Sequence, residues 1–224
     1  MKYREVVVVI PVKPLHKAKS RLSQRLTGRQ RAALTVNMLG RVVSAAVRST
    51  ADRVWVIGGD QVAGQWPPDY GVEWRWDTGS DLNDSLWQAF QMAFASDLIP
   101  FYLAADLPFV TSDDVAAAIL ASESGSNLTL CPEQGGGGTN GMIVPLGSSF
   151  RPALGEGSFR RHKDQAKALG LPVRICDSRG LRLDLDTLDD LTAFENLEPG
   201  LLKRLTTERT TPDWIDDTAC RKLV

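Results

Sequence analysis

The stretch Val6-Val-Val-Val-Ile10, closed by Pro11, gives the clearest indication of the architecture of this chain. Its five consecutive β-branched residues are apolar on both faces of an extended chain, which is typical of central parallel strands covered by helices. Similar short runs recur at Arg53-Val-Trp-Val-Ile57, Phe101-Tyr-Leu-Ala104 and Leu128-Thr-Leu-Cys131. The repeated pattern predicts a series of buried strands.

Helical periodicity occupies the intervals between these runs. Apolar residues recur at helical spacing over 30–47, 84–95 and 112–121. Further elements are expected as strands at 141–144 and 173–176 and as helices at 158–169 and 188–197. The alternation of strands and helices predicts right-handed crossovers and an α/β fold, an open and mostly parallel sheet with helices on both faces. Ligands of such sheets bind at the carboxyl ends of the strands.

Length and composition indicate one soluble domain. The 224 residues suit a single core, which we place at 1–205, and the polar stretch 206–224 is predicted to be an appendage because its periodicity is weak. Hydrophobic residues at 43% and charged residues at 24% are ordinary for a globular protein. The formal net charge of -1 argues against nucleic acid as the main partner.

The cysteines and the N-terminus favour a cytoplasmic protein. Cys131, Cys176 and Cys220 form no CxxC pair, so we expect neither a disulfide framework nor a zinc site. The valine run near the N-terminus is cut by Pro11 and Lys13 far below the length that spans a membrane. We therefore expect no export signal, no anchor and no membrane partner.

A cationic loop follows the first predicted strand. Lys13, Lys17, Lys19 and Arg21 gather there, at the edge where a ligand should bind. Such a cluster is often only a solvated basic loop. Its place directly after a first parallel strand favours binding of a triphosphate, whose charge must be neutralised by Lys or Arg donors. The loop lacks the GxxxxGK[ST] pattern of a Walker A ATPase.

Carboxylates follow two other segments. Asp106 comes directly after the strand at 101–104, and Asp184 and Asp186 alternate around a leucine, so they share one face if extended. One of the two is expected to meet Asp106 across the cleft, because Mg²⁺ in nucleotidyl transfer takes one or two carboxylates plus phosphate oxygens. As an isolated motif, Asp186-Thr187 is equally well a helix N-cap.

Two glycine-containing motifs in the second half of the chain suggest further contacts with an anion. Gly138-Thr-Asn-Gly141 allows backbone amides to approach an anion, although a plain turn explains it as well. In Gly155-Glu-Gly-Ser158, we expect Ser158 to cap a helix whose free amides favour a phosphate or carboxylate. The bland alternative is a structural cap with His162 on the helix face. Neither His16 nor His162 has the partner pattern of a nucleophilic triad.

These motifs together resemble one family. They occur in the order Ile10-Pro-Val-Lys-Pro14, Ala18-Lys-Ser-Arg-Leu22, Leu82-Asn83, Ala105-Asp-Leu-Pro108, Gly138-Thr-Asn140, Gly157-Ser-Phe159 with His162, and Asp184-Leu-Asp-Thr187. The ordered set is similar to the 2-phospho-L-lactate or phosphoenolpyruvate guanylyltransferases of coenzyme F420 biosynthesis, and it spans most of the chain.

The resemblance implies a single-domain nucleotidyltransferase of the glycosyltransferase-A type. It places Lys13, Lys19 and Arg21 at the triphosphate, Asn83 near the nucleoside, and Asp106 and Asp186 at Mg²⁺, with Asp184 as a further candidate ligand. Its acceptor pocket falls on Thr139, Asn140, Gly155, Gly157, Ser158 and His162. The implied partners are GTP and a small phosphorylated acid, and a homodimer is left open.

The expected reaction joins GMP from GTP to 2-phospho-L-lactate, phosphoenolpyruvate or 3-phospho-D-glycerate and releases pyrophosphate. Another small nucleotidyltransferase, such as a molybdopterin guanylyltransferase or a sugar-phosphate cytidylyltransferase, has the same architecture, because fold alone does not fix the substrate. A nucleotide-binding regulatory protein without turnover is the alternative from a different class. The presence of both Asp106 and Asp186 argues against it.

Overall fold

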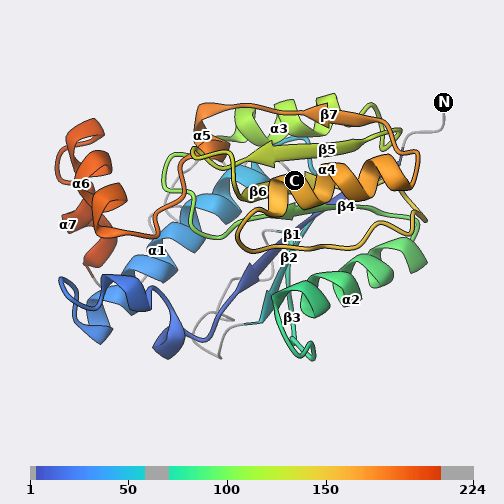
Figure 1. The fold of residues 1–224 in the computed structure, drawn as a ribbon. Helices are drawn as coiled ribbons and strands as arrows, with labels where there is room; N and C mark the ends of the chain where they lie inside the picture. Colours follow the sequence, from blue (N-terminus) through green and yellow to red (C-terminus); the bar gives the residue numbers. More distant parts are fainter. Residues whose placement is uncertain (1–3, 59–70, 208–224) are drawn as a thin grey trace.

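The computed structural model describes residues 4–58 and 71–207 (Figure 1). Its strands are β1 Val6–Val12, β2 Arg53–Gly58, β3 Val72–Arg75, β4 Ile99–Leu103, β5 Leu128–Pro132, β6 Thr139–Ile143 and β7 Val173–Ile175. Its helices are α1 Gly28–Val47, α2 Leu82–Ala95, α3 Ser112–Ala121, α4 Ser158–Ala168, α5 Arg179–Arg182, α6 Leu188–Leu197 and α7 Leu201–Thr206, with 3₁₀ turns η1 Leu15–Lys17 and η2 Ser20–Leu22.

The strands form one seven-stranded sheet in the order β3-β2-β1-β4-β6-β5-β7. Strand β1 pairs in parallel with β2 and β4, and the outer strands β3 and β7 are also parallel to their neighbours. Strand β6 alone runs antiparallel to both strands that it contacts, β4 and β5, among the described residues. The prediction of an open, mostly parallel α/β sheet is confirmed.

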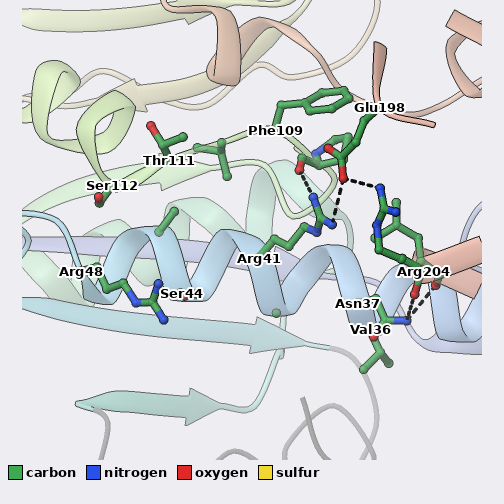
Figure 2. A pocket seen from close by; sticks show the side chains of 15 residues that line it. Val36, Asn37, Arg41, Ser44, Arg48, Phe109, Thr111, Ser112, Glu198 and Arg204 are labelled. Carbon is green, nitrogen blue, oxygen red and sulfur yellow. Dashed lines mark hydrogen bonds and ion pairs between the residues drawn. The ribbon is translucent and has the colours of Figure 1, made fainter. Parts of the chain in front are cut away.

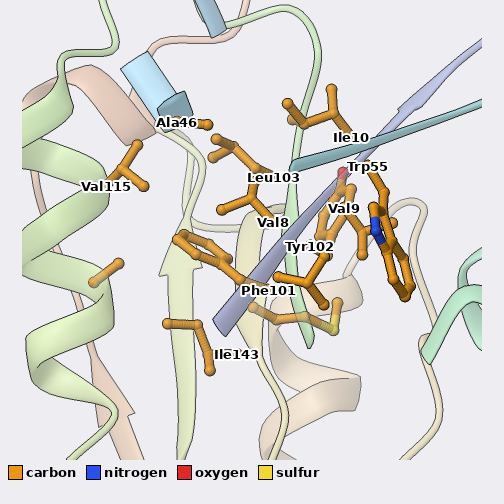
Figure 3. Packing of buried hydrophobic residues seen from close by; sticks show 14 of the residues in the cluster. Val8, Val9, Ile10, Ala46, Trp55, Phe101, Tyr102, Leu103, Val115 and Ile143 are labelled. Atoms are coloured by element: carbon orange, nitrogen blue, oxygen red, sulfur yellow. The ribbon is translucent and has the colours of Figure 1, made fainter. Parts of the chain in front are cut away.

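Helices cover both faces of the sheet. Helices α1 and α3 contact each other on one face, and α2 and α4 lie on the other (Figure 1). The central strands alternate accordingly: Val8 and Phe101 lie on the side of α1 and α3, whereas Val9 and Tyr102 lie on the side of Trp55 (Figure 3). All of these side chains are buried. The valine run of β1 is therefore apolar because neither of its faces meets water.

A second, smaller core lies beside the first loop. It joins that loop to the N-terminal half of α1, the segment 183–185 and the helices α6 and α7. Its buried members are Leu22, Leu26, Leu34, Met38, Leu183, Leu185, Leu191, Phe194, Leu201 and Leu205. This cluster fixes the cationic loop against the segment that carries Asp184 and Asp186.

Most predicted elements are present, with ends displaced by one or two residues. The helices predicted at 112–121 and 188–197 have the observed bounds, because each follows a threonine N-cap in a capping box, Thr111 with Asp114 and Thr187 with Asp190. Strand β3 and helices α5 and α7 were not predicted. The appendage at 206–224 lies outside the described residues beyond Thr207. In the described ranges, each helix is too short or too polar to cross a membrane.

Candidate active site

The first loop leaves the carboxyl end of β1 as the two short turns η1 and η2. Lys19 lies between them with a φ of 50°, in the left-handed region. This conformation costs a residue with a side chain about 1 kcal/mol or more, and such strain concentrates at functional sites. The turn places the Lys19 side chain inward, with 8% of it exposed, while Arg21 points outward with 74% exposed.

Lys19 joins the two aspartates that were expected to meet. Its Nζ lies 2.7 Å from Asp106 Oδ2 and 2.8 Å from Asp186 Oδ1. Burial opposes the charge of Lys19, but the two carboxylates outweigh it and raise the pKa of the ammonium. Burial by itself would raise the pKa of Asp186. The attraction of Lys19, Arg21 and Lys13 exceeds this effect, so the pKa of Asp186 is lowered. Arg21 Nη1 lies 3.4 Å from Asp186 Oδ2.

Backbone hydrogen bonds bring the two acidic segments together. The Leu185 N–H donates to the Asp106 carbonyl at 3.1 Å, so the segment 183–186 runs beside the end of β4. The Asp190 carboxylate accepts from the N–H groups of Asp186 and Thr187 at 3.0 and 2.7 Å. The predicted helix N-cap is present at Thr187, and Asp186 directly before it contacts Lys19.

Asp184 lies in a different setting from Asp186. Its Oδ1 accepts a hydrogen bond of 3.0 Å from the Asn140 side-chain amide, which also donates to the Leu181 carbonyl at 3.0 Å. Burial, reinforced by the charges of Asp106 and Asp186, raises the pKa of Asp184 to about 6 in spite of the Asn140 hydrogen bond. Asn140, which was predicted to bind the acceptor, thus positions the segment that carries the aspartates.

The carboxylate pair fits a divalent cation. Asp106 and Asp186 already contact one cationic nitrogen, the Lys19 ammonium, so both can also reach a single metal ion. In the described parts of the chain, no three histidine, cysteine or acidic side chains form a metal-binding group. This arrangement suits Mg²⁺, which takes few protein carboxylates and completes its octahedron with water and substrate oxygens.

The residues predicted for the acceptor pocket form a buried hydrogen-bonded group. Thr139 Oγ1 lies 3.0 Å from His162 Nδ1, and the Ser158 hydroxyl donates to Thr139 Oγ1 at 3.3 Å. The Ala153 N–H donates to His162 Nε2 at 3.0 Å, so the proton of the neutral ring lies on Nδ1. Burial, together with the charge of Arg161, lowers the pKa of His162 to about 4.

The predicted helix cap at Ser158 is wrong. Gly157 is the N-cap of α4, and the Ser158 hydroxyl is turned inward to Thr139. Gly157 has a φ of 70° and Gly155 of 116°, conformations that glycine adopts without steric cost. The N–H of Ser158 donates to the Gly155 carbonyl and that of Phe159 to the Gly137 carbonyl. Two of the amides expected to hold an anion therefore already have partners.

Arg161 is a cation at this loop that the sequence analysis did not select. Its guanidinium donates to the carbonyls of Ala153 and Glu156, and it lies beside Gly155 and Gly157. Its place in the helix that follows the Gly155-Glu-Gly157 turn is the signal that could have revealed it. Arg161 brings positive charge to the loop 153–157.

Asn83, which the resemblance places near the nucleoside, contacts the same loop. Its Oδ1 accepts from the Leu154 N–H at 2.6 Å, and its Nδ2 donates to the Leu154 carbonyl at 3.4 Å. Asn83 lies in the first turn of α2, where Asp81 is the N-cap. The side chain therefore fastens α2 to the segment before Gly155.

A different carboxylate lies at the strand ends near the first loop. Gly58 ends β2 with a φ of 85°, and a Cβ there would lie 2.6 Å from the Val12 carbonyl oxygen and 3.3 Å from Asp77 Oδ2. Asp77 is exposed, and its Oδ1 accepts from the Gly79 N–H at 2.9 Å. The Asp77 carboxylate thus lies beside the ends of β1 and β2, a position that no sequence motif indicated.

Comparison with known proteins places these features in a family. Residues 6–195 match the family model described as guanylyl transferase CofC like. The phosphoenolpyruvate guanylyltransferase of Chloroflexus aggregans is 34% identical over 195 residues, which cover 84% of this chain and 95% of that protein. The 2-phospho-L-lactate guanylyltransferase of Methanothermobacter thermautotrophicus is 32% identical over 184 residues, which cover 82% of this chain and 81% of that protein.

Solved structures agree on the fold. A chain from Desulfovibrio desulfuricans, provisionally described as a nucleotide-diphospho-sugar transferase, superposes with a TM-score of 0.73 at 16% identity, covering 97% of this chain and 96% of its own. A nucleotidyl transferase from Methanothermobacter thermautotrophicus gives a TM-score of 0.56 at 15% identity, with coverages of 89% and 98%. At these identities the likeness concerns the fold. The match over residues 6–195 shows that the chain belongs to the CofC-like guanylyl transferase family.

Proposed function

We propose that this chain transfers GMP from GTP to a small phosphorylated carboxylic acid in coenzyme F420 biosynthesis and releases pyrophosphate. The observation that carries the proposal is the Lys19 ammonium held between Asp106 and Asp186 at the carboxyl edge of β1 and β4. Family membership supports guanylyl transfer. The names of the relatives supply the acids to be tested first, phosphoenolpyruvate and 2-phospho-L-lactate.

The donor triphosphate is proposed to lie against the first loop. Lys13 and Arg21 are exposed there, and Lys19 is buried among carboxylates. Asp106 and Asp186 would hold Mg²⁺, which supplies neutralising charge to the phosphate oxygens when it is bound. The remaining positive charge comes from the loop itself, next to the strand end where ligands of parallel sheets bind.

We propose Asp77 as the group that recognises guanine. A carboxylate can accept hydrogen bonds from both N1–H and the 2-amino group of this base, and adenine offers no such pair of donors. Asp77 follows β3, and its carboxylate lies at the end of β2, two strands from β4 and Asp106, or roughly 10 Å along the sheet edge. This separation is comparable with the reach of a nucleotide from its α-phosphorus to its base.

The chemistry requires positioning and charge more than proton transfer. An ionised phosphate oxygen of the acceptor attacks the α-phosphorus in line, a new P–O bond forms, and the bond to the departing pyrophosphate breaks. Because the nucleophile is already ionised near neutral pH, no general base is needed. Lys13 and Lys19 would balance the charge on the phosphates, and the rigid ends of β1 and β4 would hold the reacting groups in line.

The acceptor acid is proposed to lie against the loop 153–157. Thr139, Ser158 and His162 support this loop from beneath through buried, neutral hydrogen bonds. Arg161 supplies positive charge beside Gly155 and Gly157, where a carboxylate would need it. The side chains first expected to touch the acid thereby act mainly by fixing the loop.

The test is a matrix of nucleoside triphosphates against phosphoenolpyruvate, 2-phospho-L-lactate and 3-phospho-D-glycerate, with products identified by mass spectrometry. We expect a product from GTP and at least one acid, with release of pyrophosphate, and turnover at least about a hundredfold lower in Asp106→Asn protein. Turnover of CTP with a sugar phosphate, or of GTP with molybdopterin alone, would identify another nucleotidyltransferase. GTP binding without turnover of any pair would identify a nucleotide-binding protein without catalysis.

The proposed role of Asp77 has its own test. The substitution Asp77→Asn removes a double acceptor for guanine and supplies an amide donor that suits the 2-oxo group of xanthine. We expect kcat/KM to fall at least about tenfold for GTP and to rise for XTP, since a bidentate base contact is worth roughly 1–3 kcal/mol. Unchanged preference for GTP over XTP would show that the base is recognised elsewhere.

We also propose that the protein acts in the cytoplasm. Cys131 and Cys176 are buried, unpaired thiols in the described structure, which suits a reducing compartment.

A further inference from the structure

A cavity of about 620 Å³ lies between α1, the segment 108–112 and the end of the described chain in α6 and α7 (Figure 2). None of the described residues that line it belongs to the ion-paired set of Lys19, Asp106 and Asp186 or to the hydrogen-bonded set of Thr139, Ser158 and His162. We propose that this cavity, here named the arginine pocket, is a second anion site that binds a small phosphorylated ligand. Its volume lies in the range of sites for small organic molecules.

One wall of the arginine pocket is a polar stripe on α1. Asn37, Arg41, Ser44 and Arg48 follow one another at intervals of three and four residues, so they share one face of the helix. Most buried residues of α1 pack against the two cores, while Gly40 and Ala45 also line the pocket beside the stripe. Figure 2 shows Arg41 reaching towards Glu198, with Ser44 and Arg48 farther along the same helix.

Two guanidinium groups converge on a single acid. Arg41 Nη1 donates to the Pro108 carbonyl at 2.9 Å, and Arg41 Nη2 lies 3.8 Å from Glu198 Oε1. Arg204 Nη2 lies 2.6 Å from the same oxygen. Figure 2 marks both ion pairs with dashed lines. Arg48 lies farther along α1, so the described lining holds three arginines and one glutamate. By formal charge the lining residues are therefore more positive than negative.

The lining favours phosphate over other anions. Arginine presents a planar fork that binds phosphate oxygens in a bidentate manner, and it is the usual choice for such groups. The hydroxyls of Ser44 and Ser112 lie on the same walls and can donate to further oxygens. Asp114 on the first turn of α3 opposes an anion, but its carboxylate already accepts from the N–H and the hydroxyl of Thr111.

Short stretches of chain connect the pocket to both aspartates of the proposed metal site. Pro108 follows Asp106 by two residues, and α6 begins two residues after Asp186. A phosphate that draws Arg41 and Arg204 away from Glu198 would shift both of these stretches of backbone together. Glu198 and Arg204 also lie beyond residues 6–195, so part of the pocket belongs to this chain outside the matched family domain.

The test uses inorganic phosphate as the probe and calorimetric titration of the full chain as the readout, against sodium chloride of equal ionic strength. We expect Arg48→Gln/Arg204→Gln protein to bind phosphate at least about tenfold more weakly, because it loses two charged donors. Arg160→Gln, on the exposed face of α4, is the matched control and should bind like the unchanged chain. Glu198→Gln should bind phosphate severalfold more tightly, a gain that a misfolded variant cannot mimic.

The readout is binding, so the inference can fail while the proposed function holds, and the reverse. Phosphate affinity that survives Arg48→Gln/Arg204→Gln but is lost in Lys13→Gln/Arg21→Gln protein would assign the anion site to the first loop and overturn the proposal. An unchanged or weaker affinity in Glu198→Gln protein would overturn it as well. Melting temperatures of all variants establish that each compared protein is folded.

Discussion

Two groups of side chains adjoin in β6 and differ in physical character. Asn140 belongs to the charged group, in which a buried Lys19 forms ion pairs with Asp106 and Asp186, and these two carboxylates are partly open to water. Its neighbour Thr139 belongs to the neutral group, in which Ser158 and His162 are buried and joined by hydrogen bonds between uncharged atoms. Only the charged group can exchange its partners for a ligand at little cost.

This difference indicates that the charged group binds ligands and that the neutral group stabilises the fold around them. A carboxylate that is partly exposed can release a lysine and accept a metal ion, because water and substrate oxygens remain within reach. A buried neutral group cannot replace its hydrogen-bond partner by a ligand in this way, because breaking the bond leaves an unsatisfied polar atom, which costs roughly 1–3 kcal/mol. We therefore expect substitutions in the charged group to change turnover and those in the neutral group to change stability.

The largest effect is expected from Asp106→Asn and Asp186→Asn. Each removes a charge at the proposed metal site without changing side-chain volume, and the loss of kcat should be at least about a hundredfold. Steady-state pyrophosphate release at saturating Mg²⁺ measures it. Asp164→Asn, an exposed aspartate on α4, is the control. Full activity in either variant would show that the residue is not a ligand of the metal.

Lys19→Met should affect both turnover and stability. The variant leaves Asp106 and Asp186 without the ammonium that joins them, and their repulsion should cost about 1–2 kcal/mol of folding free energy because both carboxylates are partly solvated. The kcat/KM for GTP should fall by about tenfold or more. Lys167→Met, at an exposed position on α4, should change neither quantity. A melting temperature equal to that of the unchanged chain would argue against a structural ion pair.

The parts of the fold that the sequence predicts rest on local signals. The valine run indicates a buried strand because no face of it is polar, and threonine caps mark the starts of α3 and α6. The sequence pattern predicts that Asp184 or Asp186 meets Asp106, because each segment follows a recognisable strand or precedes a helix, and the family resemblance selects Asp186. The charged centre is therefore largely visible in the sequence.

The remaining contacts join residues far apart in the chain through atoms that no pattern specifies. Asn83 was expected near the nucleoside, but its side chain meets the Leu154 backbone, 71 positions away. Ser158 was expected to cap a helix, yet the flexible Gly157 takes that position and leaves the hydroxyl for Thr139. Cap propensities are similar for serine and glycine, so tertiary contacts decide between them.

The neutral group should make stability depend on pH through His162. Its pKa is about 4 in the folded chain and near 6.5 when unfolded, so the unfolded state binds more protons between these values. Stability should therefore fall as pH falls from 6.5 towards 4, by up to about 3 kcal/mol. His162→Gln should reduce this loss in urea unfolding, and His16→Gln, at the other histidine, should not. Identical pH profiles of both variants would contradict the assignment.

Asp184 should act with the opposite sign. Its folded pKa is raised to about 6 from 3.8, so its ionised form destabilises the fold, and stability is lost as pH rises through 6. Asp184→Asn keeps an acceptor for Asn140 without the charge. We expect about 1–2 kcal/mol of added stability above pH 7, after allowance for partial solvation, and none near pH 4. An equal gain at both pH values would point to packing and not to charge.

The smallest effect is expected from Ser158→Ala. Because its hydroxyl donates to Thr139 and does not cap α4, its removal should cost about 1 kcal/mol of stability through one lost hydrogen bond. The KM for the acceptor acid should change less than about twofold, since the loop 153–157 retains Arg161 and the His162 contact to Ala153. Thermal unfolding and both KM values, measured on the same protein, test this expectation. A large rise in acceptor KM with an unchanged melting temperature would show that Ser158 contacts the acid directly. The neutral group would then bind a ligand as well, and the proposed difference between the two groups would be wrong.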